Sequence, residues 1–461
     1  MHIAVIDIGK TNAKLALVDL DTLTERAVIT RPNTVCPGPP WPHFDTEGHW
    51  DFILQGLAAF HKSHRIDAIS ITTHGAAAAF LGHDGQMSAP VLDYEHSYPA
   101  DIVAAYDAFR PGFDETGSPR LAQGLNLGAQ LHFQLATDPG LRARTAHIVT
   151  YPQYWAHRLT GVIASDVTSI GCHTDLWNPH LGVFSSLVDR LGLRAILAPP
   201  LRPKTVLGPI LPGIAAQTGL APDTPVACGI HDSNASLLPH LISYPPPVSV
   251  VSTGTWVVVM TAGGAAVTLD PARDSLINVN AFGQPTPSAR FMGGREYERM
   301  RGQGAAPSVQ DVQEVLSTPT FLLPAVEPSS GPFQNAVYGW TPTEPPHSDP
   351  KRDVALAFYL ALMTAECLAM TGASGTVIVE GPFARNPLYL EMLAAATRLP
   401  VFAAASQTGT AIGAALLFAA DETNPAREAG APVVSFDPKM VRYAKDWRAA
   451  VARRINSAAM A

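Results

Sequence analysis

The chain has 461 residues, of which 47% are hydrophobic and 15% are charged, and its formal net charge at pH 7 is -8. This length and composition predict a globular protein of two or three domains with large buried cores. The acidic balance excludes the basic surface that binding to nucleic acid or to an anionic membrane requires. The four cysteines, Cys36, Cys172, Cys228 and Cys367, lack the spacing of a disulfide framework, a zinc site or an iron-sulfur site.

The apolar segments indicate a soluble, cytoplasmic chain. Asp7 interrupts the only early apolar run, so no secretory signal is expected. Longer apolar stretches, such as Ala76–Leu81 and Ala414–Ala420, fall far short of the roughly 20 residues that span a bilayer. We therefore expect no membrane partner. The sequence does not set the oligomeric state, and a homodimer is one form that it allows.

The first stretch of the chain predicts a β-hairpin. Two runs rich in Val, Ile and Leu, at Ile3–Ile8 and Leu15–Val18, flank the turn Gly9-Lys10-Thr11-Asn12. A P-loop is rejected, because its first glycine would fall at Ala4 and its flexible loop would fall on strand residues. An ordinary surface hairpin is the alternative.

The residues of this turn favour a nucleotide site. Gly9 lets the backbone approach a ligand closely, and Thr11, Asn12 and the turn amides offer hydrogen-bond donors. Lys10 and Lys14 add positive charge. We therefore expect the turn to hold phosphate beside Asp7, whose carboxylate ends the first strand and would organise a metal ion.

The next elements bring polar residues to strand ends. After a proline-rich loop over residues 31–49, a helix is expected from about Glu47 to Ser63, with Asp45 or Thr46 as its cap. A buried strand at Ile66–Thr72 then delivers Thr73-His74-Gly75 at its end, where α/β sheets bind ligands. A further helix is predicted over Tyr151–Gly161, with the glycine at its C-terminal stop.

Two groups of polar residues are candidates for binding a polyhydroxylated ligand. Asp93-Tyr94-Glu95-His96 follows a short strand, and a solvated turn is its alternative interpretation. His231-Asp232 follows a strand at Thr224–Ile230 and precedes a helix. Asp232 is either a helix N-cap or a general base directed at a ligand hydroxyl. His74, His96 and His231 also raise the alternative of a metal site, which their spacing does not favour.

The second half of the chain repeats the opening. Beyond the linker Tyr244–Pro247, strand residues flank the turn Ser252-Thr253-Gly254-Thr255. Such a duplication indicates two similar domains that clamp one polyphosphate. A long helix follows at Asp353–Thr371, then a strand at Thr376–Glu380, a helix from Pro387 to Arg398 and a strand at Val401. The small residues from Thr408 to Leu417 begin a helix that could pack on a flat ligand such as adenine.

In their order and spacing these motifs resemble the FGGY family of carbohydrate kinases, over nearly the whole chain. The resemblance implies an α/β fold of two actin/hexokinase-like (ribonuclease H-like) domains with an interdomain active-site cleft. We expect an N-terminal domain at residues 1–243, a C-terminal domain at 248–440 and a helical tail at 441–461. It also implies ATP and Mg²⁺ as cofactors and a small-molecule sugar as substrate.

The resemblance also assigns roles. Asp7 would organise magnesium, and Asp232 would be the catalytic base. The sugar side would comprise His74, Gly75, Asp93, His96, His231 and Asp232. The residues that would contact ATP are Gly9, Lys10, Thr11, Asn12, Thr253, Gly254, Thr255, Gly381, Arg385, Asn386 and Gly409.

Departures from the family pattern bear on the substrate. Lys10 stands where many members carry a small hydroxyl residue or Ala. The sequence Thr72-Thr73-His74-Gly75 lacks the Gln-Met-His-Gly of xylulose kinases and looks more like L-fuculose kinases and, less closely, rhamnulose kinases, which usually have Asp at the position of Ala77. The apolar run Ala76–Phe80 would suit the methyl group of a 6-deoxy sugar, although ordinary core is the favoured interpretation.

The leading hypothesis is thus a kinase for a ketose, L-fuculose or a similar deoxy-ketohexose. The alternatives are a kinase for another ketose or polyol, such as L-rhamnulose, xylulose, ribulose or erythritol, a non-metabolic actin-like ATPase, and a sugar-sensing protein without catalysis. Retention of Asp7 and Asp232 argues against the last.

Overall fold

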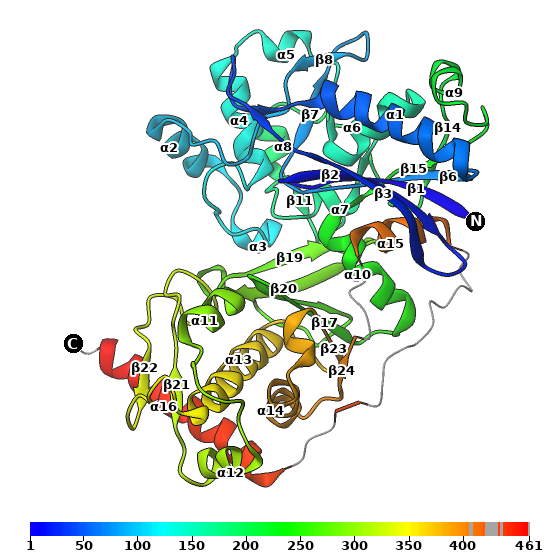
Figure 1. The fold of residues 1–461 in the computed structure, drawn as a ribbon. Coiled ribbons are helices and arrows are strands. Elements are labelled where there is room, and N and C mark those ends of the chain that lie inside the picture. Colours follow the sequence, from blue (N-terminus) through cyan, green and yellow to red (C-terminus); the bar gives the residue numbers. More distant parts are fainter. Residues whose placement is uncertain (405–408, 420–431, 434–436, 460–461) are drawn as a thin grey trace. The chain divides into compact units, whose positions relative to one another are not determined.

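The computed structural model describes residues 1–404, 409–419, 432–433 and 437–459, which divide into two compact units. Unit 1 comprises Met1–Ile242, Ile277–Pro285 and the described part of Thr408–Pro425. Unit 2 comprises Ser243–Leu276 and the described parts of Thr286–Gln407 and Ala426–Ala461. Each unit is built of helices packed on a mixed sheet (Figure 1), which confirms the α/β class.

The sheet of unit 1 is organised around its first strand. Its order is β14-β15-β6-β1-β2-β3, and β16 also pairs with β6. β1 pairs antiparallel with β2, placing Asp7 opposite Lys14, and parallel with β6, placing Asp7 beside Thr72. The strands are β1 (His2–Ile8), β2 (Asn12–Asp19), β3 (Thr24–Pro32), β6 (Ala68–Thr73), β14 (Val206–Pro209), β15 (Pro225–Ala227) and β16 (Ile230–His231).

Alternating residues of β1 fill two different cores. Ala4, Ile6 and Ile8 pack with helices α1 (Thr46–Ser63) and α6 (Tyr151–Thr160). Ile3 and Val5 pack with α10 (Asp232–Ser243) and α15 (Thr410–Ala415). Because successive side chains of a strand point to opposite faces, this alternation buries both faces of the sheet.

Unit 2 repeats this pairing. Its sheet order is β19-β20-β18-β17-β23-β24, in which β17 pairs antiparallel with β18 and parallel with β23, as β1 does with β2 and β6. The predicted duplication is therefore confirmed. The strands are β17 (Val248–Thr253), β18 (Val257–Ala262), β19 (Ser275–Val279), β20 (Pro285–Phe291), β23 (Thr376–Glu380) and β24 (Val401–Ala403).

The core of unit 2 surrounds α13 (Pro350–Met370). This helix is long and apolar enough to cross a membrane, but 78% of its most apolar window is buried inside the protein, which is typical of a core helix. α14 (Pro387–Thr397) packs beside it, and α16 (Pro438–Ala459) contacts both α14 and aromatic rings of α13. Tyr443 and Trp447 of α16 are buried, so this helix belongs to the core of unit 2.

The remaining elements complete the two units. They are β4 (Val35–Cys36), β5 (His43–Phe44), β7 (Ala78–Leu81), β8 (Met87–Ala89), α2 (Ala100–Phe109), α3 (Phe113–Thr116), α4 (Leu127–Thr137), α5 (Leu141–Arg144), β9 (His147–Thr150), β10 (Ser165–Asp166), α7 (Val167–Ile170), β11 (Trp177–Asn178), β12 (Val183–Phe184), α8 (Ser186–Arg190), β13 (Pro200–Leu201), α9 (Pro212–Thr218), η1 (Pro271–Arg273), α11 (Gly293–Met300), α12 (Val309–Ser317), β21 (Phe321–Leu323), β22 (Gly339–Thr341), η2 (Pro382–Arg385) and η3 (Leu416–Phe418).

Three elements differ from the sequence-based expectation. The strand expected at Thr224–Ile230 is divided into β15 and β16, because Gly229 adopts φ +97° and passes close to the carbonyl of Ile71. α16 begins at Pro438, earlier than the expected tail. α15, expected within the C-terminal domain, packs in unit 1, where a Cβ on Gly413 would lie 1.8 Å from the carbonyl oxygen of Ala235. The small residues of α15 allow this close approach. Thr408, where the small-residue segment was expected to begin, lies outside the residues that the structure describes.

Candidate active site

The turn between β1 and β2 is a compact loop between two antiparallel strands, and no helix follows it, as predicted. Within it the amide of Gly9 donates to the carbonyl of Asn12 (2.9 Å). Asp7 accepts a hydrogen bond from Thr410 Oγ1 (2.5 Å) and lies 3.8 Å from Lys14 Nζ. Burial raises the pKa of Asp7, while the bond from Thr410 and the charge of Lys14 oppose that shift.

Asn33, which the sequence analysis missed, fastens this turn. Its amide nitrogen Nδ2 donates to the carbonyl of Gly9 (2.8 Å), and its backbone N–H donates to the carbonyl of Thr11 (2.9 Å). Its Oδ1 lies 2.7 Å from Nε2 of the buried His49. His49 in turn contacts Arg31 (3.0 Å), which pairs with the helix cap Asp45. The turn is thus tied to the N-terminus of α1.

Lys10 directs its side chain away from the turn. Its ammonium pairs with Asp93 and lies 3.2 Å from Glu95 Oε2. It also lies over the rings of Tyr94 (4.8 Å to the centroid) and Phe44 (5.2 Å). Lys10 therefore joins the predicted phosphate turn to the predicted sugar-side residues.

His74 lies at the centre of an aromatic cluster at the end of β6. Its ring centroid is 5.0 Å from that of Phe44, 5.4 Å from Tyr94 and 5.2 Å from Tyr151. Its Nδ1 is 2.8 Å from the carbonyl oxygen of Gly75, and its Nε2 has no hydrogen-bond partner among the residues that the structure describes. Burial lowers the pKa of His74 to about 4, so the imidazole is neutral at physiological pH.

Gly75, His231 and Asp232 meet beside this cluster. A Cβ on Gly75 would lie 2.7 Å from His231 Nε2, so only glycine fits there without a shift. His231 Nε2 is 3.1 Å from Asp232 Oδ1. Burial lowers the pKa of His231 to about 4. The imidazole next to the carboxylate is thus neutral at physiological pH.

Asp232 is at once the first residue of α10 and an accessible carboxylate. Its Oδ1 accepts from the amide of Ser233 (2.6 Å), and its side chain remains 30% exposed. Burial of most of the carboxylate raises the pKa of Asp232. Behind it the buried Thr168 accepts from the amide of His231 (3.0 Å) and donates to Asp166 (2.7 Å). Asp232 lies inside the first turn of α10 and bonds to the adjacent amide, whereas an N-cap accepts from the second or third amide beyond it.

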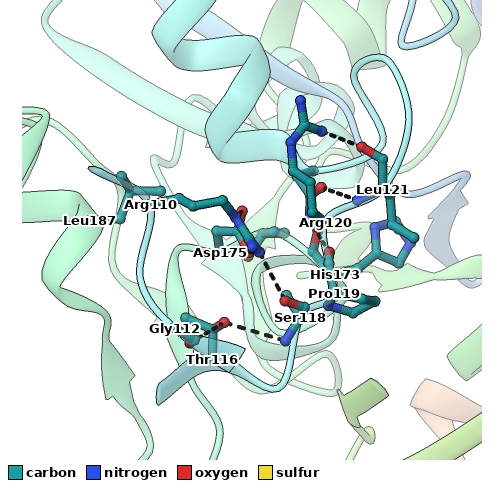
Figure 2. A network of polar contacts seen from close by, with 12 residues as sticks. Arg110, Gly112, Thr116, Ser118, Pro119, Arg120, Leu121, His173, Asp175 and Leu187 are labelled. Atoms are coloured by element: carbon teal, nitrogen blue, oxygen red, sulfur yellow. Dashed lines mark hydrogen bonds and ion pairs between the residues drawn. The ribbon is translucent and has the colours of Figure 1, made fainter. Parts of the chain in front are cut away.

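A further network braces the loop that carries Tyr94. Figure 2 shows Arg110 bound to the buried Asp175 by two hydrogen bonds (3.0 and 2.7 Å) and to the carbonyl of Ser118 (2.9 Å). Asn126 bonds to the carbonyls of Pro119 (3.0 Å) and His173 (3.1 Å). The same segment reaches the sugar-side loop, because the amide of Gly124 donates to the carbonyl of Tyr94 (2.9 Å).

The turn of unit 2 is also closed by a backbone hydrogen bond, over a span one residue shorter than in unit 1. The amide of Gly254 donates to the carbonyl of Trp256 (2.9 Å). Thr253 uses its hydroxyl internally, donating to the carbonyl of Glu380 (2.6 Å) and accepting from the amide of Phe383 (3.1 Å). Gly381 is required beside it, because φ is +82° and a Cβ would lie 2.0 Å from the carbonyl oxygen of Thr253.

The other residues that were predicted to contact ATP or the sugar lie in several different elements. Asn386 caps α14, with Oδ1 accepting from the amides of Leu388 (3.1 Å) and Tyr389 (3.3 Å), and Arg385 is exposed nearby. Gly409 precedes α15 in unit 1. His96 is half-buried, and its ring contacts Phe133 and Tyr98. Gly294 was missed, although a Cβ there would lie 2.1 Å from the carbonyl oxygen of Gly254.

The apolar run Ala76–Phe80 is part of the cores of unit 1. Ala77 and Ala79 pack in the cluster with α1 and α6, and Ala78 and Phe80 pack in the cluster with α4. The side chains of this run therefore stabilise the fold, and they lend no weight to a pocket for a sugar methyl group.

Two family models together match most of the chain. Residues 2–239 match the N-terminal domain of the FGGY family of carbohydrate kinases, and residues 245–427 match the C-terminal domain of carbohydrate kinase FGGY. The chain belongs to the FGGY family of carbohydrate kinases. It is an ATP-dependent carbohydrate kinase, whose substrates are ATP and a small-molecule sugar. The alternative of a non-metabolic ATPase is therefore set aside.

Solved structures resemble this kinase along its whole length. A carbohydrate kinase from Novosphingobium aromaticivorans is 34% identical, with a TM-score of 0.88, over 97% of this chain and 100% of that one. A xylulose kinase from Rhodospirillum rubrum is 21% identical, with a TM-score of 0.78, over 98% of both chains. A glycerol kinase from Plasmodium falciparum, solved with ADP, is 14% identical, with a TM-score of 0.77, over 98% of both. The last two share the fold with this kinase.

Asp7 fits the magnesium ion that the family implies. Mg²⁺ is commonly held by one or two carboxylates, water and substrate phosphates. Asp7 offers one largely buried carboxylate, and the nearby charge of Asp232 adds to the cost of ionising it, a cost that a cation would relieve. No group of three or more His, Cys, Asp or Glu side chains suited to a metal occurs in the described ranges.

Proposed function

We propose that this kinase transfers the γ-phosphate of ATP to a hydroxyl of a ketose, with Asp232 as general base. The observation that carries the proposal is the partly exposed carboxylate of Asp232, whose Oδ1 lies 3.1 Å from Nε2 of the neutral His231, with the neutral His74 close by. Neutral imidazoles can hydrogen-bond to sugar hydroxyls without taking the proton, which leaves Asp232 as the group that accepts it.

The proposed reaction is a direct transfer. The substrate hydroxyl gives its proton to Asp232 as its oxygen forms a bond to the γ-phosphorus, and the bond from that phosphorus to the bridging oxygen breaks to release ADP. Because the transition state is loose, positioning and charge neutralisation provide most of the catalysis. Bound Mg²⁺ would supply positive charge to the phosphates next to Asp7.

The nucleotide contacts are assigned to the two turns. In unit 1 the amides of Gly9, Thr11 and Asn12 bind phosphate, with Lys14 as the nearby cation. In unit 2 the backbone of Thr253, Gly254 and Thr255 does so, since the hydroxyl of Thr253 is already used within the protein. Gly381, Arg385, Asn386 and Gly409 are assigned to the adenosine.

The leading substrate is L-fuculose or a similar deoxy-ketohexose, on the resemblance of Thr72-Thr73-His74-Gly75 to L-fuculose kinases. Xylulose is a second candidate, because several proteins with this fold are xylulose kinases. L-rhamnulose, ribulose and erythritol remain further alternatives. We also propose a cytoplasmic location.

A coupled assay of ADP release with Mg-ATP tests the substrate. The panel comprises L-fuculose, L-rhamnulose, D- and L-xylulose, D- and L-ribulose, erythritol and glycerol. We expect one ketose to exceed the others by at least about tenfold in kcat/KM, a modest discrimination for a site that pairs with specific hydroxyls. ATP turnover that ignores every sugar would overturn the proposal.

A further inference from the structure

Lys10 and Lys14 flank the same turn but engage different partners. Lys14 lies between Asp7 (3.8 Å) and Glu25 (2.9 Å). The ammonium of Lys10 binds Asp93 and Glu95, and Asp93 lies 83 positions further along the chain. Of these two cations, Lys14 is therefore the one placed beside the carboxylate that ends β1.

The surroundings of Lys10 are partly desolvated. The side chain of Lys10 is 20% exposed and that of Asp93 is 9% exposed, whereas Glu95 is 58% exposed. The rings of Tyr94 and Phe44 also face the ammonium. An ion pair in such a place is screened less than a surface pair, so the pair with Asp93 is the stronger of the two.

The same two rings belong to the cluster around His74. Phe44 and Tyr94 contact both the ammonium of Lys10 and the imidazole of His74. The Nε2 atom of His74 is buried and has no hydrogen-bond partner among the described residues. A buried polar atom of this kind needs a partner, and a ligand hydroxyl or a water can supply it.

The charges near this cluster are predominantly negative. Asp93, Glu95 and Asp232 contribute three carboxylates against the single ammonium of Lys10. The imidazoles of His74 and His231 add no positive charge at neutral pH. A carboxylate on the sugar would be repelled here, whereas neutral hydroxyls can donate hydrogen bonds to these oxygens.

We propose that Lys10 is a positioning residue for the sugar and not a phosphate ligand, and that the site around it selects a neutral polyhydroxylated acceptor over a sugar acid. Lys10 holds the carboxylate of Asp93 and the ring of Tyr94 in place, and Lys14 alone supplies the cationic contact to phosphate from this turn. The proposal rests on the proposed sugar kinase function and specifies its acceptor.

The test compares Lys10→Met with Lys14→Met on the preferred neutral sugar. We expect Lys10→Met to raise the KM for the sugar about 10- to 100-fold, because it leaves the carboxylate of Asp93 without its cation, and to change the KM for ATP less than about 3-fold. Lys14→Met should show the reverse pattern. Lys10→Arg keeps a cation that can pair with carboxylates and stack on rings, so it should restore most of the sugar affinity.

Controls separate the inference from folding and from the proposed function. Lys62→Met removes an exposed lysine of α1 and should match the wild type in both KM values. Thermal unfolding and binding of ADP to Lys10→Met by calorimetry show whether the variant is folded. If the wild type phosphorylates no sugar, the proposed function fails before any variant is compared.

Two outcomes would overturn the inference itself. One is a Lys10→Met variant that binds ADP, folds and raises the KM for ATP as much as Lys14→Met does while its sugar KM is unchanged. The other is a wild-type enzyme whose kcat/KM for gluconate equals or exceeds that for every neutral sugar, because the acidic surroundings of Lys10 predict at least about a tenfold preference for the neutral acceptor.

Discussion

At the scale of single residues, Asp232 begins a helix and is also the proposed general base. It begins α10 and accepts a hydrogen bond from the amide of the next residue, and its carboxylate stays partly exposed. Nε2 of the neutral His231 lies 3.1 Å from Oδ1, the same oxygen that accepts from Ser233. The second oxygen, Oδ2, is thereby the one best placed to receive a proton from a sugar hydroxyl.

The pH dependence of turnover should identify this carboxylate. Because burial raises the pKa of Asp232, kcat/KM for the sugar should rise with pH through a single group whose pKa lies above the usual 3.8. Both His74 and His231, with pKa values of about 4, are already neutral near pH 6.5. Their protonation should therefore not change the slope of the kcat/KM profile near that pH. The measurement is kcat/KM over roughly pH 4.5 to 8.5 at saturating Mg-ATP.

A change of slope in the kcat/KM profile near pH 6.5 that disappears in His74→Asn would contradict this expectation. It would assign the titrating group to the histidine. The same profile measured for His231→Asn provides the matched comparison.

At the scale of elements, the turn between β1 and β2 depends on residues outside the hairpin. Asn33 closes it through bonds to the carbonyls of Gly9 and Thr11, and His49 and Arg31 extend this support to α1. These bonds hold the backbone of the turn in place, ready for the phosphate that we propose it binds. Such preorganisation lowers the cost of binding an anion.

Asn33→Ala tests this support. We expect the KM for ATP to rise about 3- to 30-fold and stability to fall by about 1–3 kcal/mol, because the half-buried carbonyl of Gly9 and the buried His49 each lose a partner. The KM for the sugar should change less. Asn178→Ala is the control, since the side chain of Asn178 likewise bonds to the backbone of a turn, there by accepting from two amides in the exposed turn between β11 and β12.

Two results together would contradict the claim that Asn33 holds this turn in place. The two variants would lose equal stability, and the KM for ATP would be unchanged in Asn33→Ala. Asn33 would then be an ordinary structural residue.

Local patterns predicted the elements better than the contacts between them. The two hairpins, α1 with its Asp45 cap, and α6 with Gly161 at its end were all foreseen, because each has a signature within a few residues. Asn33 was missed because it lies in a proline-rich loop, where an asparagine is also explained by a turn. The direction of Lys10 depends on Asp93, which no local pattern connects to it.

At the scale of the whole molecule, duplication was visible in the sequence but the allocation of α15 was not. The matched family model places residues 245–427 in the C-terminal domain, whereas α15 packs on β1 and β6 of unit 1. Ser70 of β6 donates to the carbonyl of Ala414 (2.6 Å), and Thr410 reaches Asp7. Tertiary packing of small residues decides this placement, and sequence order alone could not.

Stability should depend on pH through buried histidines. Burial lowers the pKa of His49 to about 4, so the folded protein keeps it neutral while the unfolded chain takes up a proton below pH 6.5. Its contribution to stability is full above pH 6.5 and is lost as pH falls toward 4. Asp166, whose pKa burial raises to about 6, acts in the opposite direction, so a difference between variants is needed.

His49→Asn isolates this effect. Between pH 7.5 and pH 5 the wild type should lose about 2 kcal/mol of unfolding free energy relative to the variant, since only the wild type gains a proton at this site on unfolding. Urea unfolding at the two pH values measures the difference. A gap between the two proteins that stays constant with pH would show that His49 does not titrate as described.

The most direct test of the account is sugar-dependent ADP release by Asp232→Asn compared with the wild type. On the preferred ketose we expect kcat to fall about 10²- to 10⁴-fold, the usual contribution of a general base, while the variant keeps its fold and its affinity for ADP. A variant that retains wild-type kcat would contradict the account, because another group would then have to accept the proton from the sugar.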